Sequence, residues 1–231
     1  MNDFCNLLQN IKDNPVFYLG KPSITCLYSF LVGYLSTLSL LGFSHAGSVT
    51  EGFQEWIQER ENTKLTRSWA GILLFVCGSE TKAFYAFFEL FQNFFKEKEK
   101  ILEKENNLTY NSDNVFNSNI YDLYELLKSL KKRPGIFLGT DPSITKLDMY
   151  LRGYSLAKRE VGLPPTEQEQ NFEEFQSWVQ ERYGIKSNQS WAKIIIFYST
   201  DEQESLERFF ELFEEYLNQN KSQNQVIQLR V

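Results

Sequence analysis

The chain has 231 residues, of which 42% are hydrophobic and 23% are charged, as is ordinary for a globular protein. A net charge of −6 argues against nucleic acid as the main partner, and a single histidine excludes most histidine-dependent metal sites and acid–base machinery. Aromatic residues reach 16%, with 20 Phe, 12 Tyr and 4 Trp. So many large rings predict well-filled cores, or a core together with an aromatic contact surface.

The sequence carries no signal of export or of a membrane span. The first residues lack the positive and apolar regions of a signal peptide. The most apolar stretch, residues 30–43, is shorter than the roughly 20 residues that cross a bilayer, so we expect a buried helix there. The three cysteines have no metal-like spacing and are interpreted as reduced thiols. We therefore expect a cytoplasmic protein without membrane contact.

A tandem repeat organises the chain. Residues 7–34 align with residues 126–154, with one insertion, and residues 53–95 align without gaps with residues 175–217. The second pair shares the phrases FQxWxQER, SWAxI and FFELF at a constant offset of 122 residues. That period is too long for a solenoid unit, so it indicates a duplicated domain.

Composition separates the two copies. The segment after the first copy begins with alternating Lys and Glu, which we expect to extend the preceding helix, and then becomes rich in Asn and Ser without an apolar period. We predict a first helical domain over residues 1–98, a flexible linker over 99–119, a second helical domain over 120–217 and a frayed tail over 218–231.

Helical periodicity dominates the first copy. In its last predicted helix, apolar rings recur at spacings of three and four residues, so they lie on one face of the helix. These rings belong to Phe84, Phe87, Phe88, Phe91, Phe94 and Phe95. The second copy has apolar residues at the same places. We therefore predict a mainly α protein of two tandem homologous helical bundles.

In the second copy, the phrase RPGIFLG at residues 133–139 is interpreted as a turn with a short extended piece that buries its rings. Asp141 and Pro142 are predicted to open a helix that runs through about residue 154. Residues 172–182 form an amphipathic helix. Residues 193–198 (KIIIFY) favour a short buried helix capped by Ser190, and a β-strand is the alternative. Residues 199–202 supply the N-cap and the acidic first turn of the last helix.

Two polar groups are candidate partner-binding residues. Residues 201–215 hold seven acids against one Arg, which is typical of a solvated helix face or of a surface that attracts a basic partner. The Gln and Glu of FQxWxQER recur in both copies, either as an exposed helix face or as part of a partner surface. The candidates are Asp201, Glu204, Glu207, Glu211, Gln176 and Gln180.

The first copy is more apolar than the second. It has Leu38, Leu41 and Phe43 in a region where the second copy has Lys158 and Arg159. An apolar face on one of two homologous copies indicates that the face is covered. We expect packing against the other copy, or a homodimer through copy one.

The motifs RPGxFLG, SITxLxxYLxGY, FxxWxxxR and SWAKII together resemble a group of small bacterial proteins, some of which resemble immunity proteins of polymorphic or contact-dependent toxin systems. The second copy matches better, because the first lacks the RPG phrase and the Lys of SWAK. The resemblance implies a protein that binds and neutralises one toxin domain.

No catalytic, cofactor or metal residues are predicted, so we expect a non-enzymatic protein-binding module whose partner is a protein, such as a basic toxin domain. The alternative is a small-molecule-binding or regulatory tandem domain. Its pocket would be lined by the large rings of Trp69, Trp191, Tyr34 and Tyr154. The competing explanation for these rings is core packing.

Overall fold

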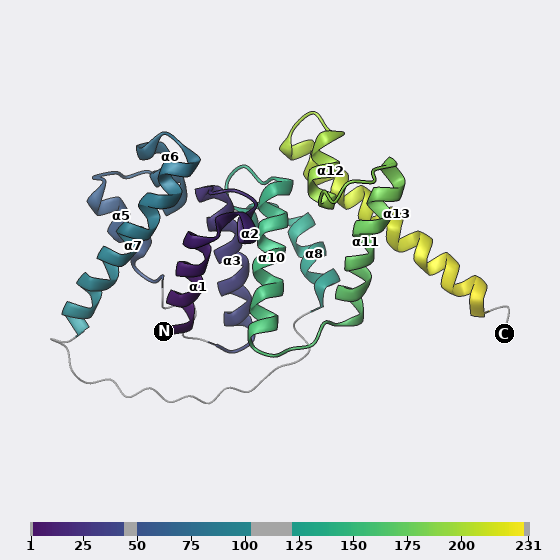
Figure 1. Ribbon diagram of the computed structural model, residues 1–231, viewed down its shortest axis with the longest axis horizontal. Helices are drawn as coiled ribbons and strands as arrows, with labels where there is room; N and C mark the ends of the chain where they lie inside the picture. The colour runs from purple at the N-terminus through teal and green to yellow at the C-terminus, as the bar shows by residue number, and fades with distance from the viewer. Residues whose placement is uncertain (1, 44–49, 103–121, 229–231) are drawn as a thin grey trace. The chain divides into compact units, whose positions relative to one another are not determined.

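The computed structural model describes residues 2–43, 50–102 and 122–228, and every regular element within these ranges is a helix (Figure 1). The predicted mainly α fold class is confirmed. The chain divides into two compact units: unit 1 is Met1–Ile120 with Met149–Val161, and unit 2 is Tyr121–Asp148 with Gly162–Val231. Each unit is described by itself.

Unit 1 combines the helices of the first half of the chain with most of one helix from the second half. Its helices are α1 (Asn2–Asp13), α2 (Pro15–Leu19), α3 (Ile24–Leu40), α5 (Phe53–Arg60), α6 (Trp69–Cys77), α7 (Glu80–Leu102) and the part of α10 from Met149 onward.

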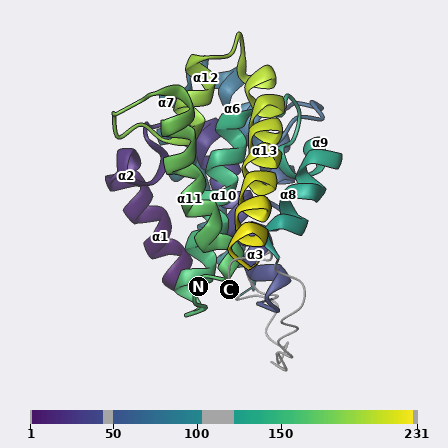
Figure 2. The same ribbon diagram turned by 90° about the vertical axis from the view of Figure 1, so that its right-hand side faces the viewer.

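Unit 2 contains the remaining helices, with α13 in the foreground of Figure 2 between α11 and the pair α8 and α9. Its helices are α8 (Leu123–Lys132), α9 (Pro134–Leu138), the first turn of α10 (Ile144–Glu160), α11 (Glu167–Tyr183), α12 (Trp191–Phe197) and α13 (Glu202–Gln228).

One phenylalanine at equivalent sequence positions occupies the centre of each core. Phe53 in unit 1 and Phe175 in unit 2 are both 0% exposed. The rings around Phe53 have centroids 5.0–6.0 Å from it and belong to Trp56, Trp69, Phe87, Phe91 and Phe94. Those around Phe175 lie at 5.3–6.3 Å and belong to Phe172, Trp178, Trp191, Phe209, Phe213 and Tyr216. The predicted apolar faces of α7 and α13 therefore build the cores.

Serine caps explain the SWA phrase. The hydroxyl of Ser190 accepts a hydrogen bond from the backbone N–H of Lys193, and Ser68 does the same for Gly71. Residues 193–197 lie in α12, so the predicted helix is confirmed and the strand alternative is excluded for this segment.

Two local predictions for residues 133–154 were wrong. Residues 134–138 form a short helix with Pro134 at its first turn, and Ile136 is 69% exposed, so this segment does not bury all its apolar side chains. Helix α10 begins at Ile144, because Ser143 and not Asp141 caps it, accepting a bond from the N–H of Lys146. Asp141 has a φ of 57°, which turns the chain before the helix.

In each unit, a glutamate in the first turn of one helix accepts hydrogen bonds from the N-terminus of another helix. We call this arrangement the glutamate staple. The Glu80 carboxylate, in the first turn of α7, accepts hydrogen bonds from the Ser23 hydroxyl (2.7 Å), the Thr25 N–H (3.0 Å) and the Thr25 hydroxyl (2.7 Å) at the start of α3. In unit 2, Glu202 accepts from the N–H and hydroxyl of Thr145 at 3.1 and 2.7 Å. A free helix N–H attracts a carboxylate, so the staple caps one helix with a side chain of another.

We expect Glu80→Gln to destabilise unit 1 by about 1–2 kcal/mol at neutral pH, because the amide replaces one of the two acceptor oxygens with a donor that faces other donors. Burial alone raises the pKa of Glu80, but the bonds from Ser23 and Thr25 outweigh it and hold the pKa below its ordinary value of 4.5. The stabilisation is therefore complete above pH 4.5 and is lost as the pH falls through the lowered folded-state value.

Urea unfolding at pH 7 and pH 4 measures this effect. Glu89→Gln, at an exposed position of α7, is the control, and an equal loss in both variants would contradict the staple.

The ends of α7 and α13 extend beyond the predicted bundles. Helix α7 continues through Leu102, and the rest of the predicted linker, residues 103–119, lies outside the described residues. Helix α13 runs to Gln228, so most of the predicted tail is helical. In the described part of the chain, no single helix has the length and apolar character of a membrane span. Within the described residues, Trp69–Cys77 and Glu80–Lys98 together have the length and apolar composition of a span, but the pair is bent by 119°.

Candidate interaction surface on unit 2

The acidic candidates of α13 lie along one stripe of the helix. Glu204, Glu207 and Glu211 are spaced by three and four residues, which places them on one face, and all three are exposed. Asp201, directly before the helix, is exposed as well. The four acids therefore share one end and one side of α13, but they differ in what they contact.

Asp201 and Glu204 hold the start of α13. Asp201 accepts hydrogen bonds from the N–H groups of Gln203 and Glu204, both at 2.8 Å. The Glu204 carboxylate accepts from the hydroxyl of Thr200 at 2.5 Å and from its N–H at 2.7 Å. These two bonds, the hydroxyl bond first, lower the pKa of Glu204. The predicted N-cap is confirmed, and both acids have a structural role in the helix start.

Glu207 and Glu211 are the acids on this stripe that the helix start does not use. Glu211 lies 3.5 Å from a guanidinium nitrogen of Arg208, an exposed pair. Arg208 also lies near the hydroxyl of Tyr183, which is the main cause that raises the pKa of the guanidinium. The acidic stripe therefore approaches the end of α11.

Exposed aromatic rings continue the surface. The rings of Tyr183 and Tyr198 stack at 4.5 Å with an interplanar angle of 19°, and Phe197 meets Tyr198 edge-on at 5.1 Å. Phe197 is 77% exposed and Tyr198 is 49% exposed. Ring stacking thus joins α11 to α12, and Tyr183 lies near Arg208, which pairs with Glu211 on α13. We call Tyr183, Phe197, Tyr198, Glu207, Arg208 and Glu211 the aromatic–acidic surface.

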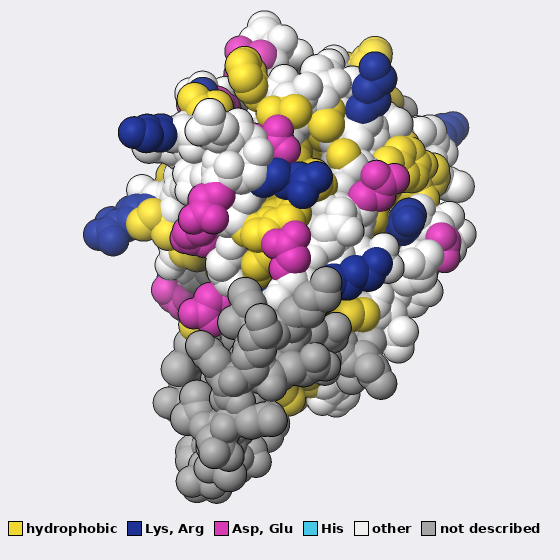
Figure 3. Space-filling view, turned by 90° about the vertical axis from the view of Figure 1, so that its left-hand side faces the viewer, with side chains coloured by type: hydrophobic (Ala, Val, Ile, Leu, Met, Phe, Trp, Pro, Cys, Tyr) yellow, Lys and Arg dark blue, Asp and Glu magenta, His cyan; other side chains and the backbone are white. Residues whose placement is uncertain are grey.

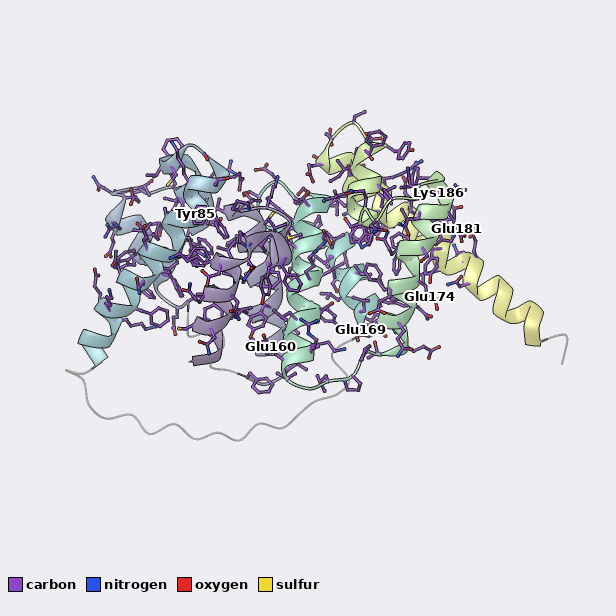
Figure 4. All side chains as sticks on the ribbon, in the orientation of Figure 1. Tyr85, Glu160, Glu169, Glu174, Glu181 and Lys186 are labelled. Carbon is purple, nitrogen blue, oxygen red and sulfur yellow. The ribbon has the colours of Figure 1, made fainter. Side chains whose placement is uncertain are left out.

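The equivalent positions of unit 1 lack this combination. Phe75, the counterpart of Phe197, is also 77% exposed, but Tyr85 and Ala86 occupy the places of Glu207 and Arg208. Figure 4 labels Tyr85 on α7, and Figure 3 shows acidic and basic side chains mixed with hydrophobic ones on the face of unit 1 that carries α5–α7. Among the described residues, the combination of neighbouring aromatic rings with acidic side chains on the adjacent helix therefore occurs in unit 2.

The two candidate glutamines contact their own unit. The side-chain N–H of Gln176 donates to the carbonyl of Gln189 at 3.0 Å, and its oxygen accepts from the N–H of Trp191 at 2.6 Å. Gln180 donates to the carbonyl of Ser187 at 2.7 Å. Both amides therefore hold the 184–190 loop against α11.

Unit 1 repeats this arrangement, which explains the recurring motif. Gln54 donates to the carbonyl of Arg67 at 3.0 Å and Gln58 to that of Leu65 at 2.9 Å. The indole N–H of Trp56 likewise donates to Glu97, as that of Trp178 does to Gln219. The FQxWxQER phrase thus forms the same loop and helix contacts in both units.

The rings of the alternative pocket hypothesis are core residues. The four residues, Trp69, Trp191, Tyr34 and Tyr154, are at most 9% exposed. Trp69 stacks on the buried ring of Phe87 in α7, and Trp191 lies at a tilt against the buried ring of Phe209 in α13. Within residues 2–43, 50–102 and 122–228, no three His, Cys, Asp or Glu side chains are grouped as metal ligands.

Sequence reasoning missed the aromatic members of the surface. The KIIIFY segment was interpreted as buried, yet Lys193 and Phe197 are four residues apart on one face of α12, and a lysine marks the exposed side. The buried face carries Trp191, Ile194 and Ile195. That spacing was the available signal for an exposed Phe197.

No family model, curated protein or solved structure matches this chain.

Proposed function

We propose that the protein is a non-enzymatic binding module that captures a basic protein domain through the aromatic–acidic surface of unit 2. The observation that carries this proposal is the ring of Tyr183 stacked on the exposed ring of Tyr198, with the exposed Phe197 beside them and with Arg208 and Glu211 of α13 close by. Tyr and Arg are the residue types that dominate the energy of protein interfaces.

The chemistry of the surface favours a cationic partner. Carboxylates accelerate the encounter with a basic surface by long-range attraction. Exposed ring faces add apolar contact area and attract guanidinium or ammonium groups. A partner with Arg and Lys around an apolar patch fits both features.

The resemblance to immunity proteins supports a more specific role. We propose that the basic partner is a toxin domain, such as a nuclease whose active site is positively charged, and that binding blocks it. The protein would then act in the cytoplasm of the cell that makes it.

We further propose that residues 1–98 and 120–217 are two homologous helical-bundle domains. The repeated sequence motifs support this interpretation, as do the repeated serine caps, glutamate staples and glutamine-to-loop bonds. The difference between the copies at α7 and α13 suggests that the second copy has the larger part in binding.

A charge-reversal pair tests the surface without touching the cap of α13. We expect Glu207→Lys with Glu211→Lys to slow association with the protein encoded by the adjacent reading frame about tenfold or more, and to weaken its salt dependence, because the attraction is reversed. Surface plasmon resonance at two salt concentrations measures both effects.

The matched control changes net charge by the same amount on another helix. Glu174 and Glu181 are exposed, lie along α11 in Figure 4, and are replaced together by Lys. We expect this variant to keep most of the association rate. Equal rates in the two double variants would overturn the assignment of the site to α13.

A further inference from the structure

Helix α3 and the second part of α10 contact each other more closely than side chains allow. In unit 1, a Cβ placed on Gly33 would lie 2.1 Å from the backbone oxygen of Tyr150, and one placed on Gly153 would lie 2.1 Å from the backbone oxygen of Phe30. Figure 1 shows the two helices side by side. Only glycine permits this backbone approach, so both glycines are required at the crossing.

The crossing is reciprocal. Gly33 and Gly153 differ by 120 residues, and so do Phe30 and Tyr150. The surface that α3 offers to α10 is therefore equivalent to the surface that α10 offers to α3. This is the contact pattern of an isologous pair, as in a two-fold homodimer.

Side chains around the crossing fix its register. The hydroxyl of Tyr34 donates to the Glu160 carboxylate at 2.5 Å, and the hydroxyls of Ser36 and Tyr150 are 3.0 Å apart. Three residues of α10 also belong to the hydrophobic cluster of unit 1, namely Met149, Leu156 and Ala157. Unit 1 is thus completed by the helix segment that begins at Met149, which is separated in sequence from the main part of the unit by residues 121–148.

From this geometry we propose that a second copy of the chain is a partner for α3: its residues 149–160 replace the chain's own, and the two copies form an exchanged dimer. Each α3 then makes the same contacts in monomer and dimer, which is why such exchange has a low free-energy cost. The proposal is independent of the aromatic–acidic surface, which lies on other helices.

Refolding the full-length chain with two different tags tests the exchange. We expect a dimer that contains both tags and whose share rises with protein concentration during refolding, detected by light scattering and native mass spectrometry. A chain that stays monomeric at every refolding concentration would overturn the proposal.

Two glycine variants distinguish this interface from any other. Gly33→Ala and Gly153→Ala chains, differently tagged, are refolded together. In a mixed exchanged dimer, one α3–α10 pair has both glycines and the second pair has both alanines, and the second alanine adds less strain where the helices are already separated. We expect the mixed dimer to exceed its random share of half. A random distribution would place the contact on another face and contradict the proposal.

Discussion

Replacing Gly33 with alanine is expected to lower the free energy of unfolding of unit 1 by about 3 kcal/mol. The added Cβ would lie 2.1 Å from a backbone oxygen, and a backbone cannot move aside as the end of a flexible side chain can. Helices α3 and α10 must separate, and the packing of Leu156 and Ala157 in the unit 1 core loosens with them. Chemical denaturation followed by circular dichroism measures the loss.

Gly135→Ala is the matched control for this variant. A Cβ at Gly135 meets nothing within 4 Å and its backbone does not have a positive φ. We expect a change within about 0.5 kcal/mol, as at most surface positions. If Gly33→Ala were equally neutral, the close crossing of α3 and α10 would be contradicted.

Phe175→Ala is expected to destabilise unit 2 by about 3–5 kcal/mol, the usual loss for a fully buried Phe. Its ring is 0% exposed and has six aromatic neighbours on α11, α12 and α13. Removing it leaves a cavity at the point where these three helices meet. Thermal unfolding monitored by tryptophan fluorescence measures the effect.

Phe197→Ala removes the same side chain from an exposed position and separates stability from binding. Because Phe197 is 77% exposed, we expect little change in unfolding but weaker binding of the partner. A large loss of stability in Phe197→Ala, or none in Phe175→Ala, would contradict the assignment of core and surface rings.

Much of the helical fold was predictable because single local signals decide it. The spacing of apolar residues identified the buried faces of α7 and α13, and Ser190 before Trp191 identified the start of α12. Local reasoning failed at the start of α10, where Asp141 before Pro142 competed with Ser143 as the candidate cap. Helix α10 begins at Ile144, after Ser143, and its first turn is held by Glu202.

The candidate site was predictable only in part. The acids of α13 are visible in the sequence as a charge run, and Asp201 belongs to the predicted N-cap, but the sequence does not show that Glu204 bonds back to Thr200 while Glu207 and Glu211 take no part in the helix start. The stacking of Tyr183 on Tyr198 joins residues 15 positions apart across a loop, which no periodicity reports.

Co-expression of the full chain with the product of the adjacent reading frame tests the central proposal most directly. We predict that the neighbouring protein arrests growth when expressed alone, that this chain restores growth and co-purifies with it, and that Glu207→Lys with Glu211→Lys weakens both effects while Glu174→Lys with Glu181→Lys does not. A neighbour that is harmless and forms no complex with this chain would contradict the proposed role as an immunity protein.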